Sequence, residues 1–228
     1  MVFFRKSSPE KIRRSLLTQV KESPFKQFLE SPLPDRDQKI IDTEFLALDF
    51  ETTGLDEKND AILTMGYTVI KKGRVQLKHN AHQVIKINKE IPEKSIVIHK
   101  ITHDRVDQGE HLHTVMESLL KKIAGRVLLV HFARIERGFL NAACEQIYGH
   151  KIPAYYVDTF EIERRRLQNI QPEVAPNLLR LFNIRERYSL PRYHAHSALE
   201  DAIATAELFL AQATHGSNLN APVKQYLI

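Results

Sequence analysis

The chain has 228 residues, 43% hydrophobic and 27% charged, with a formal charge of +5. This apolar content is too high for a disordered chain, and the length suits one α/β domain with a substantial core. No stretch approaches the roughly eighteen apolar residues of a membrane span. The single Cys144 excludes an internal disulfide. Because the start turns basic without an apolar segment, we expect no signal peptide. The single cysteine fits a reducing, cytoplasmic location.

The positive charge is concentrated at the start of the chain. Residues 1–40 carry nine Lys or Arg against five acids, a net charge of +4, and the remainder carries +1. Apolar spacing within 8–31 predicts one or two amphipathic helices, interrupted at Pro24. We therefore expect a basic helical N-terminal extension (1–40), a main domain (41–214) and a polar, mobile C-terminal tail (215–228). The basic extension suggests an anionic partner.

The main domain begins with strands and continues with alternating helices and strands. Short apolar runs predict strands, and apolar residues at helical spacing predict helices. Five strands are expected at 44–50, 61–70, 74–78, 126–130 and 155–157, with a further edge-like stretch near 82–87. Helices are expected at 111–124, 135–148, 159–169, 175–183 and 197–213. A meander followed by alternating units predicts an α/β fold, in which one mixed five-stranded sheet is flanked by helices.

Two acidic residues stand at the end of the first predicted strand. Asp49 and Glu51 are two residues apart, so their side chains project from the same face of the strand. Two carboxylates this close repel unless a positive charge lies between them, and a hard divalent cation with oxygen ligands would supply it. The alternative is a pair of acids at a solvated strand end. The following residues 52–54 could offer hydroxyls and backbone amides to a ligand at the same edge.

A second cluster opens the helix expected at 197–213. His196 and Asp201 lie five residues apart at the helix start, so both could point into one site. A carboxylate there could complete a metal site, and a histidine with a near-neutral pKa could take a proton from water. Ordinary polar residues of a first helical turn are the alternative interpretation.

Taken together, the two clusters resemble a known family. The segment Asp49-Phe-Glu-Thr-Thr-Gly-Leu55, with His196-Ser-Ala-Leu-Glu-Asp201-Ala202 downstream, is similar to the DEDDh branch of the 3′→5′ exonucleases, the family of the proofreading epsilon subunit of bacterial DNA polymerase III. The resemblance covers roughly residues 44–213 and implies a ribonuclease H-like fold. It implies that Asp49, Glu51 and Asp201 are metal ligands and that His196 is the general base.

The resemblance extends to segments that would contact the substrate. It implies substrate-binding roles for Thr52, Thr53, Gly54, Leu55, His99 and Phe139. His99 lies in Ile-His-Lys-Ile-Thr, where relatives have Gly in place of Lys100. In Asp158-Thr159, which also resembles relatives, we expect a helix cap instead of a catalytic group.

The middle motif departs from the family pattern. Relatives have His-Asn-Ala-x-Phe-Asp, whereas this chain has His131-Phe-Ala-Arg-Ile-Glu136. Glu136 therefore stands where the motif has Asp, and Phe132 where it has Asn. Glutamate keeps the charge but adds a methylene, and Mg²⁺ demands near-ideal octahedral geometry. The change could be compensated by the backbone, could favour Mn²⁺ or could remove one metal.

The resemblance implies a metal-dependent 3′→5′ exonuclease that releases nucleoside 5′-monophosphates from single-stranded or frayed ends. Two divalent ions, Mg²⁺ or Mn²⁺, would be held by Asp49, Glu51, Glu136 and Asp201. DNA is the expected substrate, with RNA or short oligonucleotides as the alternative. A catalytically weak nucleic-acid-binding or polymerase-associated module is the rival hypothesis. No membrane contact is expected; a polymerase or other protein partner and the oligomeric state stay open.

Overall fold

A computed structural model describes residues 7–87, 92–93, 95, 101, 103–171, 173–193, 197–216 and 218–228. Two predicted site residues, His99 and His196, lie outside the described residues. Among the described helices, none has both the length and the apolar character needed to cross a lipid bilayer.

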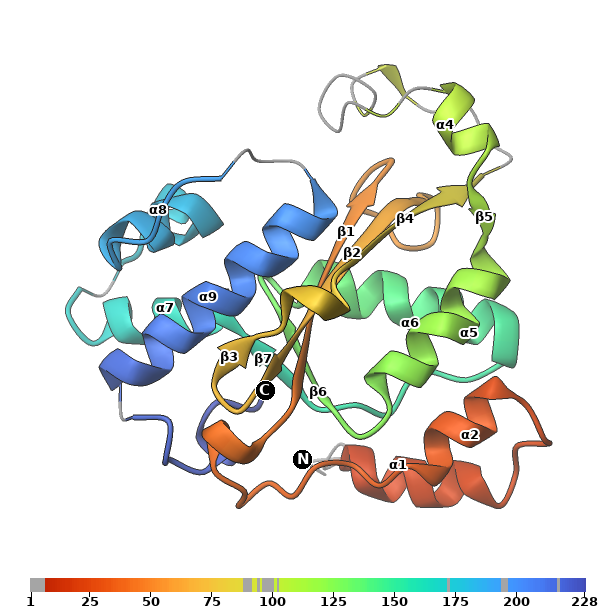
Figure 1. Cartoon of the computed structure of the whole chain (residues 1–228), viewed down its shortest axis with the longest axis horizontal. Helices are drawn as coiled ribbons and strands as arrows, with labels where there is room; N and C mark the ends of the chain where they lie inside the picture. Colours follow the sequence, from red (N-terminus) through yellow and green to blue (C-terminus); the bar gives the residue numbers. More distant parts are fainter. Residues whose placement is uncertain are drawn as a thin grey trace, which may run out of the picture.

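The centre of the fold is a mixed sheet (Figure 1). Its strands run in the order β5-β4-β2-β1-β6-β7, and β3 pairs with β2. β1 is antiparallel to β2 and parallel to β6, which is parallel to β7. The strands are β1 (Phe45–Thr52), β2 (Ile62–Lys71), β3 (Arg74–Val75), β4 (Ala81–Lys86), β5 (Glu110–His111), β6 (Val127–Val130) and β7 (Tyr156–Asp158).

The predicted mixed sheet is confirmed, but it has seven strands instead of five, because the edge-like stretch forms β4 and the two-residue β5 pairs with it. Between β2 and β3, Lys72 and Gly73 both have positive φ, 51° and 64°. This is the backbone that a tight two-residue hairpin requires, because it matches the twist of the strands.

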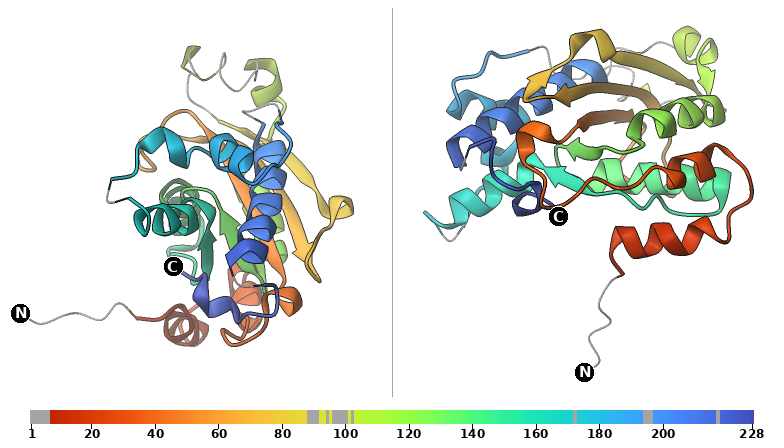
Figure 2. Two further views of the ribbon diagram at one scale, coloured as in Figure 1. Left: turned by 90° about the vertical axis from the view of Figure 1, so that its left-hand side faces the viewer. Right: turned by 60° about the horizontal axis from the view of Figure 1, so that its bottom comes forward.

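Helices cover both faces of the sheet (Figures 1 and 2). The described helices are α1 (Pro9–Leu17), α2 (Pro24–Glu30), α4 (His103–Asp107), α5 (Leu112–Ile123), α6 (Arg134–Tyr148), α7 (Thr159–Gln168), α8 (Leu181–Arg187) and α9 (Ala198–Gly216), with 3-10 turns η1 (Ile40–Asp42), η2 (Leu77–His79), η3 (Pro176–Leu179) and η4 (Val223–Gln225). Side chains alternate along β1, so Leu46 and Leu48 pack in one core cluster with α5 and α6. Phe45 and Ala47 pack in a second cluster with α9.

The N-terminal extension packs on the main domain. Phe25 and Leu29 of α2 are fully buried, and the Phe25 ring stacks on Tyr148 of α6 at a centroid distance of 5.4 Å. Arg13 of α1 donates a hydrogen bond to the Leu29 carbonyl, which ties the two helices together. The helices are interrupted before Pro24, as expected, and Pro24 is the first residue of α2. Proline suits this position because the N–H group that it lacks would have no hydrogen-bond partner within the helix.

Two expectations were wrong. The single helix expected at 175–183 is divided into η3 and α8, because Arg180 is extended and the Leu179 carbonyl accepts a hydrogen bond from His131. The described part of the tail is not merely a polar surface segment but packs on the main domain: Val223 is 1% exposed and Leu227 forms a β-bridge with Val157. The division of the chain at 1–40, 41–214 and 215–228 stays a prediction.

Candidate active site

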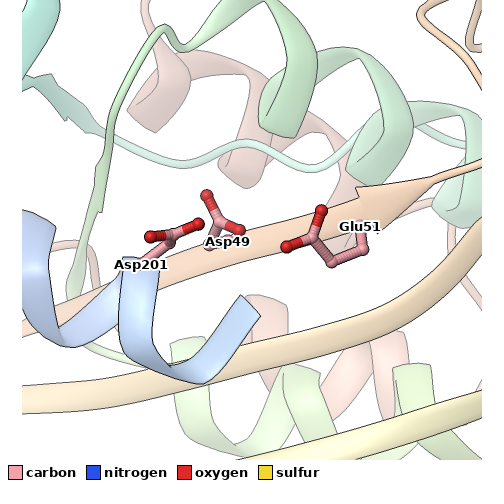
Figure 3. Close-up of side chains that lie close together, drawn as sticks. All are labelled: Asp49, Glu51 and Asp201. Atoms are coloured by element: carbon pink, nitrogen blue, oxygen red, sulfur yellow. The ribbon is translucent and has the colours of Figure 1, made fainter. Parts of the chain in front are cut away.

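The last residues of β1 carry the first two acidic side chains of the candidate site. Asp49 and Glu51 follow Phe45 and Ala47 in the alternation, so they share the face of the sheet that α9 covers. Figure 3 shows both carboxylates projecting from β1 toward the same region. The sequence spacing therefore predicted their common direction correctly.

The third carboxylate belongs to Asp201 in the first turn of α9. It lies beside Asp49 (Figure 3). The start of α9 packs close to β2 at this point. Gly66 is paired with Asp49 across the two strands, and a Cβ on Gly66 would lie 2.1 Å from the Ala198 backbone. Only glycine permits this approach of helix to sheet. Sequence reasoning missed Gly66, although an isolated glycine inside a strand pattern signals close backbone approach.

The three carboxylates form one compact cluster. One oxygen each from Asp49, Glu51 and Asp201 lies within 4.8 Å of the others. Glu51 is 6% exposed, and the other two side chains are partly buried. Burial raises the pKa of Asp49 well above its ordinary value, and the negative charges of Glu136, Asp201 and Glu51 raise it further. The folded chain thus brings together negative charges that repel one another.

Glu136 approaches the cluster from the helix layer on the other face of the sheet. It lies in the first turn of α6 and is 4% exposed. Burial raises its pKa, and the charges of Asp158 and Glu51 add to this effect. Its Oε2 atom is buried without a hydrogen-bond partner in the described part of the chain. Glu136 therefore points inward, but it does not belong to the 4.8 Å cluster of the other three acids.

The start of α6 is held by Asp158 at the end of β7. The Asp158 carboxylate accepts hydrogen bonds from the backbone N–H groups of Phe132, Ala133 and Phe160, each at 2.9 Å. The prediction that Asp158 caps a helix is confirmed, since it caps α7. Its two bonds to residues before α6 were not predicted, because they join segments 25 and 26 residues apart. They fix the turn from which Glu136 projects.

His131 precedes this turn and plays no acid–base part in the described geometry. Its Nε2 donates a hydrogen bond to the Leu179 carbonyl at 3.1 Å, and its Nδ1 lies 2.8 Å from the Thr159 hydroxyl. Burial lowers the pKa of His131 to about 4. The ring is therefore neutral at physiological pH and holds β6, α7 and η3 together.

The loop after β1 presents the residues predicted to contact substrate. The Thr52 hydroxyl donates to the Gly54 carbonyl, and the Thr53 hydroxyl donates to Asp60. A Cβ on Gly54 would lie 2.3 Å from the Asp60 carboxylate, so the loop folds tightly around Asp60. Leu55 is 74% exposed at the loop tip. The four residues lie next to Glu51 as expected, but their contact with substrate stays a prediction.

Phe139 is the remaining described residue of the predicted substrate site. Its side chain is 3% exposed and packs in the core with α5 and β1. It also lines a pocket of about 360 Å³ together with Ile62, Leu112 and Lys86. Its direct contact with a nucleotide stays a prediction.

The residues present fit divalent cations. Four acidic side chains from β1, α6 and α9 gather here, and carboxylate oxygens are the ligands that Mg²⁺ and Mn²⁺ prefer. A cation between them would offset the repulsion and the desolvation that raise the pKa of Asp49. Asp49, Glu51 and Asp201 would form the compact part of such a site, and the Glu136 Oε2 atom, which accepts no hydrogen bond in the described part of the chain, would offer a fourth donor.

Solved structures with similar folds are nucleases. The nuclease domain of 3′hExo, described as a DEDDh family member bound to rAMP, aligns with a TM-score of 0.60 at 19% identity, covering 78% of this chain and 95% of that domain. Exonuclease X in complex with 5′ overhanging duplex DNA aligns with a TM-score of 0.60 at 18% identity, covering 79% of this chain and 99% of the other. These likenesses confirm the ribonuclease H-like fold.

The sequence itself has related proteins and a matching family. A DNA polymerase III epsilon subunit from Treponema pallidum is 28% identical over 77% of this chain and 79% of its own length. A PolC-type DNA polymerase III from Thermotoga maritima is 29% identical over 76% of this chain, which spans only 12% of that polymerase. The family model described as Exonuclease (RNase_T) matches residues 46–209, which include Asp49, Glu51, Glu136 and Asp201. The chain therefore belongs to this exonuclease family.

Proposed function

We propose that the chain is a metal-dependent 3′→5′ exonuclease that releases nucleoside 5′-monophosphates from single-stranded or frayed ends, preferentially of DNA. The observation that carries the proposal is the three-carboxylate cluster of Asp49, Glu51 and Asp201, with Glu136 directed toward it. Divalent cations held there would supply a water of lowered pKa and would stabilise the charge on the leaving 3′-oxygen. No other carboxylate cluster of this kind occurs among the described residues.

The chain's own residues have separate tasks in this proposal. Asp49 and Glu51 are fixed on the central strand, so their oxygens keep one geometry throughout the reaction. Asp201 and Glu136 close the ligand set from two helices. His196, five residues before Asp201 in the sequence, accepts the proton of the attacking water. Thr52, Thr53, Gly54, Leu55, His99 and Phe139 hold the terminal nucleotide.

DNA is proposed as the substrate because relatives at 28% and 29% identity are named as DNA polymerase III proteins. RNA is the second candidate, since the 3′hExo domain of similar fold was solved with rAMP. A polymerase as partner is a further proposal that rests on the names of the same relatives. The cytoplasmic location likewise stays a proposal.

The test is hydrolysis of matched DNA and RNA oligonucleotides carrying a 5′ label, with Mg²⁺ or Mn²⁺. We expect a ladder of shortened 5′-labelled products in the wild type, and a loss of at least about 1,000-fold in rate for Asp49→Asn, which removes a ligand charge at nearly constant shape. His196→Ala should also stop trimming but should keep metal binding. Arg74→Ala, on the distant strand β3, is the matched control and should trim normally.

The same assay distinguishes the alternatives. Binding without shortening in either metal would contradict the enzyme and favour the catalytically weak binding module. Faster trimming of RNA would reverse the substrate preference. Glu136→Asp shortens the side chain by one methylene, so a changed ratio of Mn²⁺- to Mg²⁺-supported rates would show that glutamate sets the metal preference.

A further inference from the structure

A second pocket opens beside the first turn of α6, outside the carboxylate cluster. Its volume is about 330 Å³, and its walls include the aromatic rings of Phe132 and Phe160 and the side chains of Arg134, Arg137 and Arg165. Glu136 lies in the same helical turn but is buried, whereas Arg134 and Arg137 are exposed. One turn of α6 therefore directs an acid to the candidate active site and two cations to this pocket.

The aromatic part of the pocket is held at a conformational cost. Phe132 has a φ of 71°, in the left-handed region, which costs a non-glycine residue about 1–2 kcal/mol. Its side chain is 39% exposed, so little burial compensates for that cost. The Phe132 and Phe160 rings lie 5.0 Å apart between centroids, at an interplanar angle of 57°. A solvent-exposed aromatic residue in a strained conformation indicates a role in binding, not in core packing.

The pocket carries both signs of charge, because Asp158, Glu161 and the last residue, Ile228, line it beside the three arginines. Within the part of the chain that the structure describes, neither Arg134 nor Arg137 forms an ion pair, and the Arg137 guanidinium lies 5.4 Å from the centroid of the Tyr156 ring. Arg165 is paired with Glu161 at 2.8 Å, so these two charges offset each other. The Asp158 carboxylate is 6% exposed and accepts three backbone N–H groups. Two unpaired guanidiniums thus flank an aromatic pair.

We propose that this pocket, formed by Phe132, Phe160, Arg134 and Arg137, binds the single-stranded part of a nucleic acid next to its reacting end. An aromatic face stacks with any base, and a guanidinium matches the geometry of a phosphate, so the combination binds a strand without reading its sequence. The proposal deepens the proposed function, because it assigns a second contact for the same substrate on the adjacent face of α6.

Direct binding tests the pocket without requiring catalysis. The probe is a fluorescent single-stranded DNA of about 20 nucleotides, followed by anisotropy in EDTA so that no metal-dependent cleavage occurs. Phe132→Asn removes the ring, and asparagine tolerates a positive φ. We expect the Kd to rise about tenfold, which corresponds to loss of one base stack. We also expect the thermal stability to stay equal or to increase, whereas a packing role would lower it.

The contribution of the two arginines is tested by the salt dependence of binding. The double variant Arg134→Ala with Arg137→Ala should reduce the slope of log Kd against log salt by about 1.4, since each single-strand phosphate contact contributes about 0.7. The control Arg74→Ala with Lys78→Ala removes two charges from β3 and η2, on the other side of β1 from β6 and β7. It should change the slope much less.

The result that overturns this proposal is a Kd and a salt slope that neither variant changes; the pocket would then serve another kind of partner, such as a protein segment. Failure of the proposed function looks different, because the wild type would then trim no oligonucleotide although the pocket variants still weaken binding. Where trimming occurs, Phe132→Asn should raise the KM for the long strand more than the KM for a dinucleotide.

Discussion

Two helix starts deliver acidic side chains to the same centre from opposite faces of the sheet, and they do so by different means. At α9, the backbone itself approaches the sheet, because Gly66 leaves space for Ala198. At α6, the backbone is held by the buried Asp158 carboxylate and includes a left-handed Phe132. The position of α9 therefore depends on the absence of a side chain at Gly66, and the position of the α6 start depends on hydrogen bonds to Asp158.

This difference affects how closely each acidic side chain is held to the other carboxylates of the site. Asp201 joins Asp49 and Glu51 within 4.8 Å, whereas Glu136 contributes charge to the site from outside that cluster. We therefore expect the α9 start to tolerate change less than the α6 start.

The largest expected effect comes from Gly66→Ala. The new Cβ would lie 2.1 Å from the Ala198 backbone, so α9 must move away from β2 and carry Asp201 with it. We expect a loss of about 3 kcal/mol in the free energy of unfolding, typical of an overpacked core, and at least about 100-fold in the rate of trimming. Chemical denaturation and the labelled-oligonucleotide assay measure the two losses.

Gly125→Ala is the matched control for this substitution. Gly125 has a φ of 70°, but a Cβ at this position would have nothing within 4 Å, so only the backbone strain of about 1 kcal/mol is expected. A Gly66→Ala variant that behaved no worse than Gly125→Ala would show that the close approach of α9 is unnecessary.

A smaller effect is expected from Asp158→Asn at the other helix start. The amide group cannot replace both carboxylate oxygens as acceptors, so at least one of the three backbone N–H groups loses its partner. We expect about 2 kcal/mol less stability and a rate lowered about tenfold, because Glu136 is then held less firmly. Ser23→Ala removes the cap of α2, far from the site, and should cost about 1 kcal/mol without lowering the rate.

The contrast between the helix starts also explains what the sequence could predict. The alternation in β1 and the helical spacing of α9 are local patterns, so they predicted the strand, the helix and the common direction of Asp49 and Glu51. Gly66, Asp60 and the bonds of Asp158 to the start of α6 act between segments distant in sequence. No periodicity within one segment indicates such contacts.

The wrong expectations have the same origin. The helix expected at 175–183 had suitable local spacing, but the His131 bond to the Leu179 carbonyl and the extended Arg180 divide it. The tail looked polar, yet Val223 and Leu227 find partners on η1 and β7 that only the folded chain supplies. Tertiary contacts therefore decided the elements for which local propensity was weak.

The smallest expected effect is a shift of thermal stability with metal and pH. In the folded chain, the pKa of Asp49 lies above its ordinary 3.8 and the pKa of Glu136 lies above its ordinary 4.5. At pH values between the ordinary and the raised pKa of each group, the folded state therefore binds more protons than the unfolded state. Without metal, stability should therefore fall as the pH rises from about 4 through the folded-state pKa values. A cation held by the carboxylates reverses this loss.

We expect 10 mM Mg²⁺ or Mn²⁺, taken as about ten times the Kd, to add about 1.4 kcal/mol, or about 4 °C in Tm, at pH 8 and less at pH 5. Asp49→Asn removes one of the repelling charges, so its metal-free Tm at pH 8 should exceed that of the wild type, and its metal-dependent shift should be largely lost. A lower metal-free Tm in Asp49→Asn would mean that the carboxylate stabilises the fold by itself. The gathering of acids on β1, α6 and α9 would then need an explanation other than cation binding.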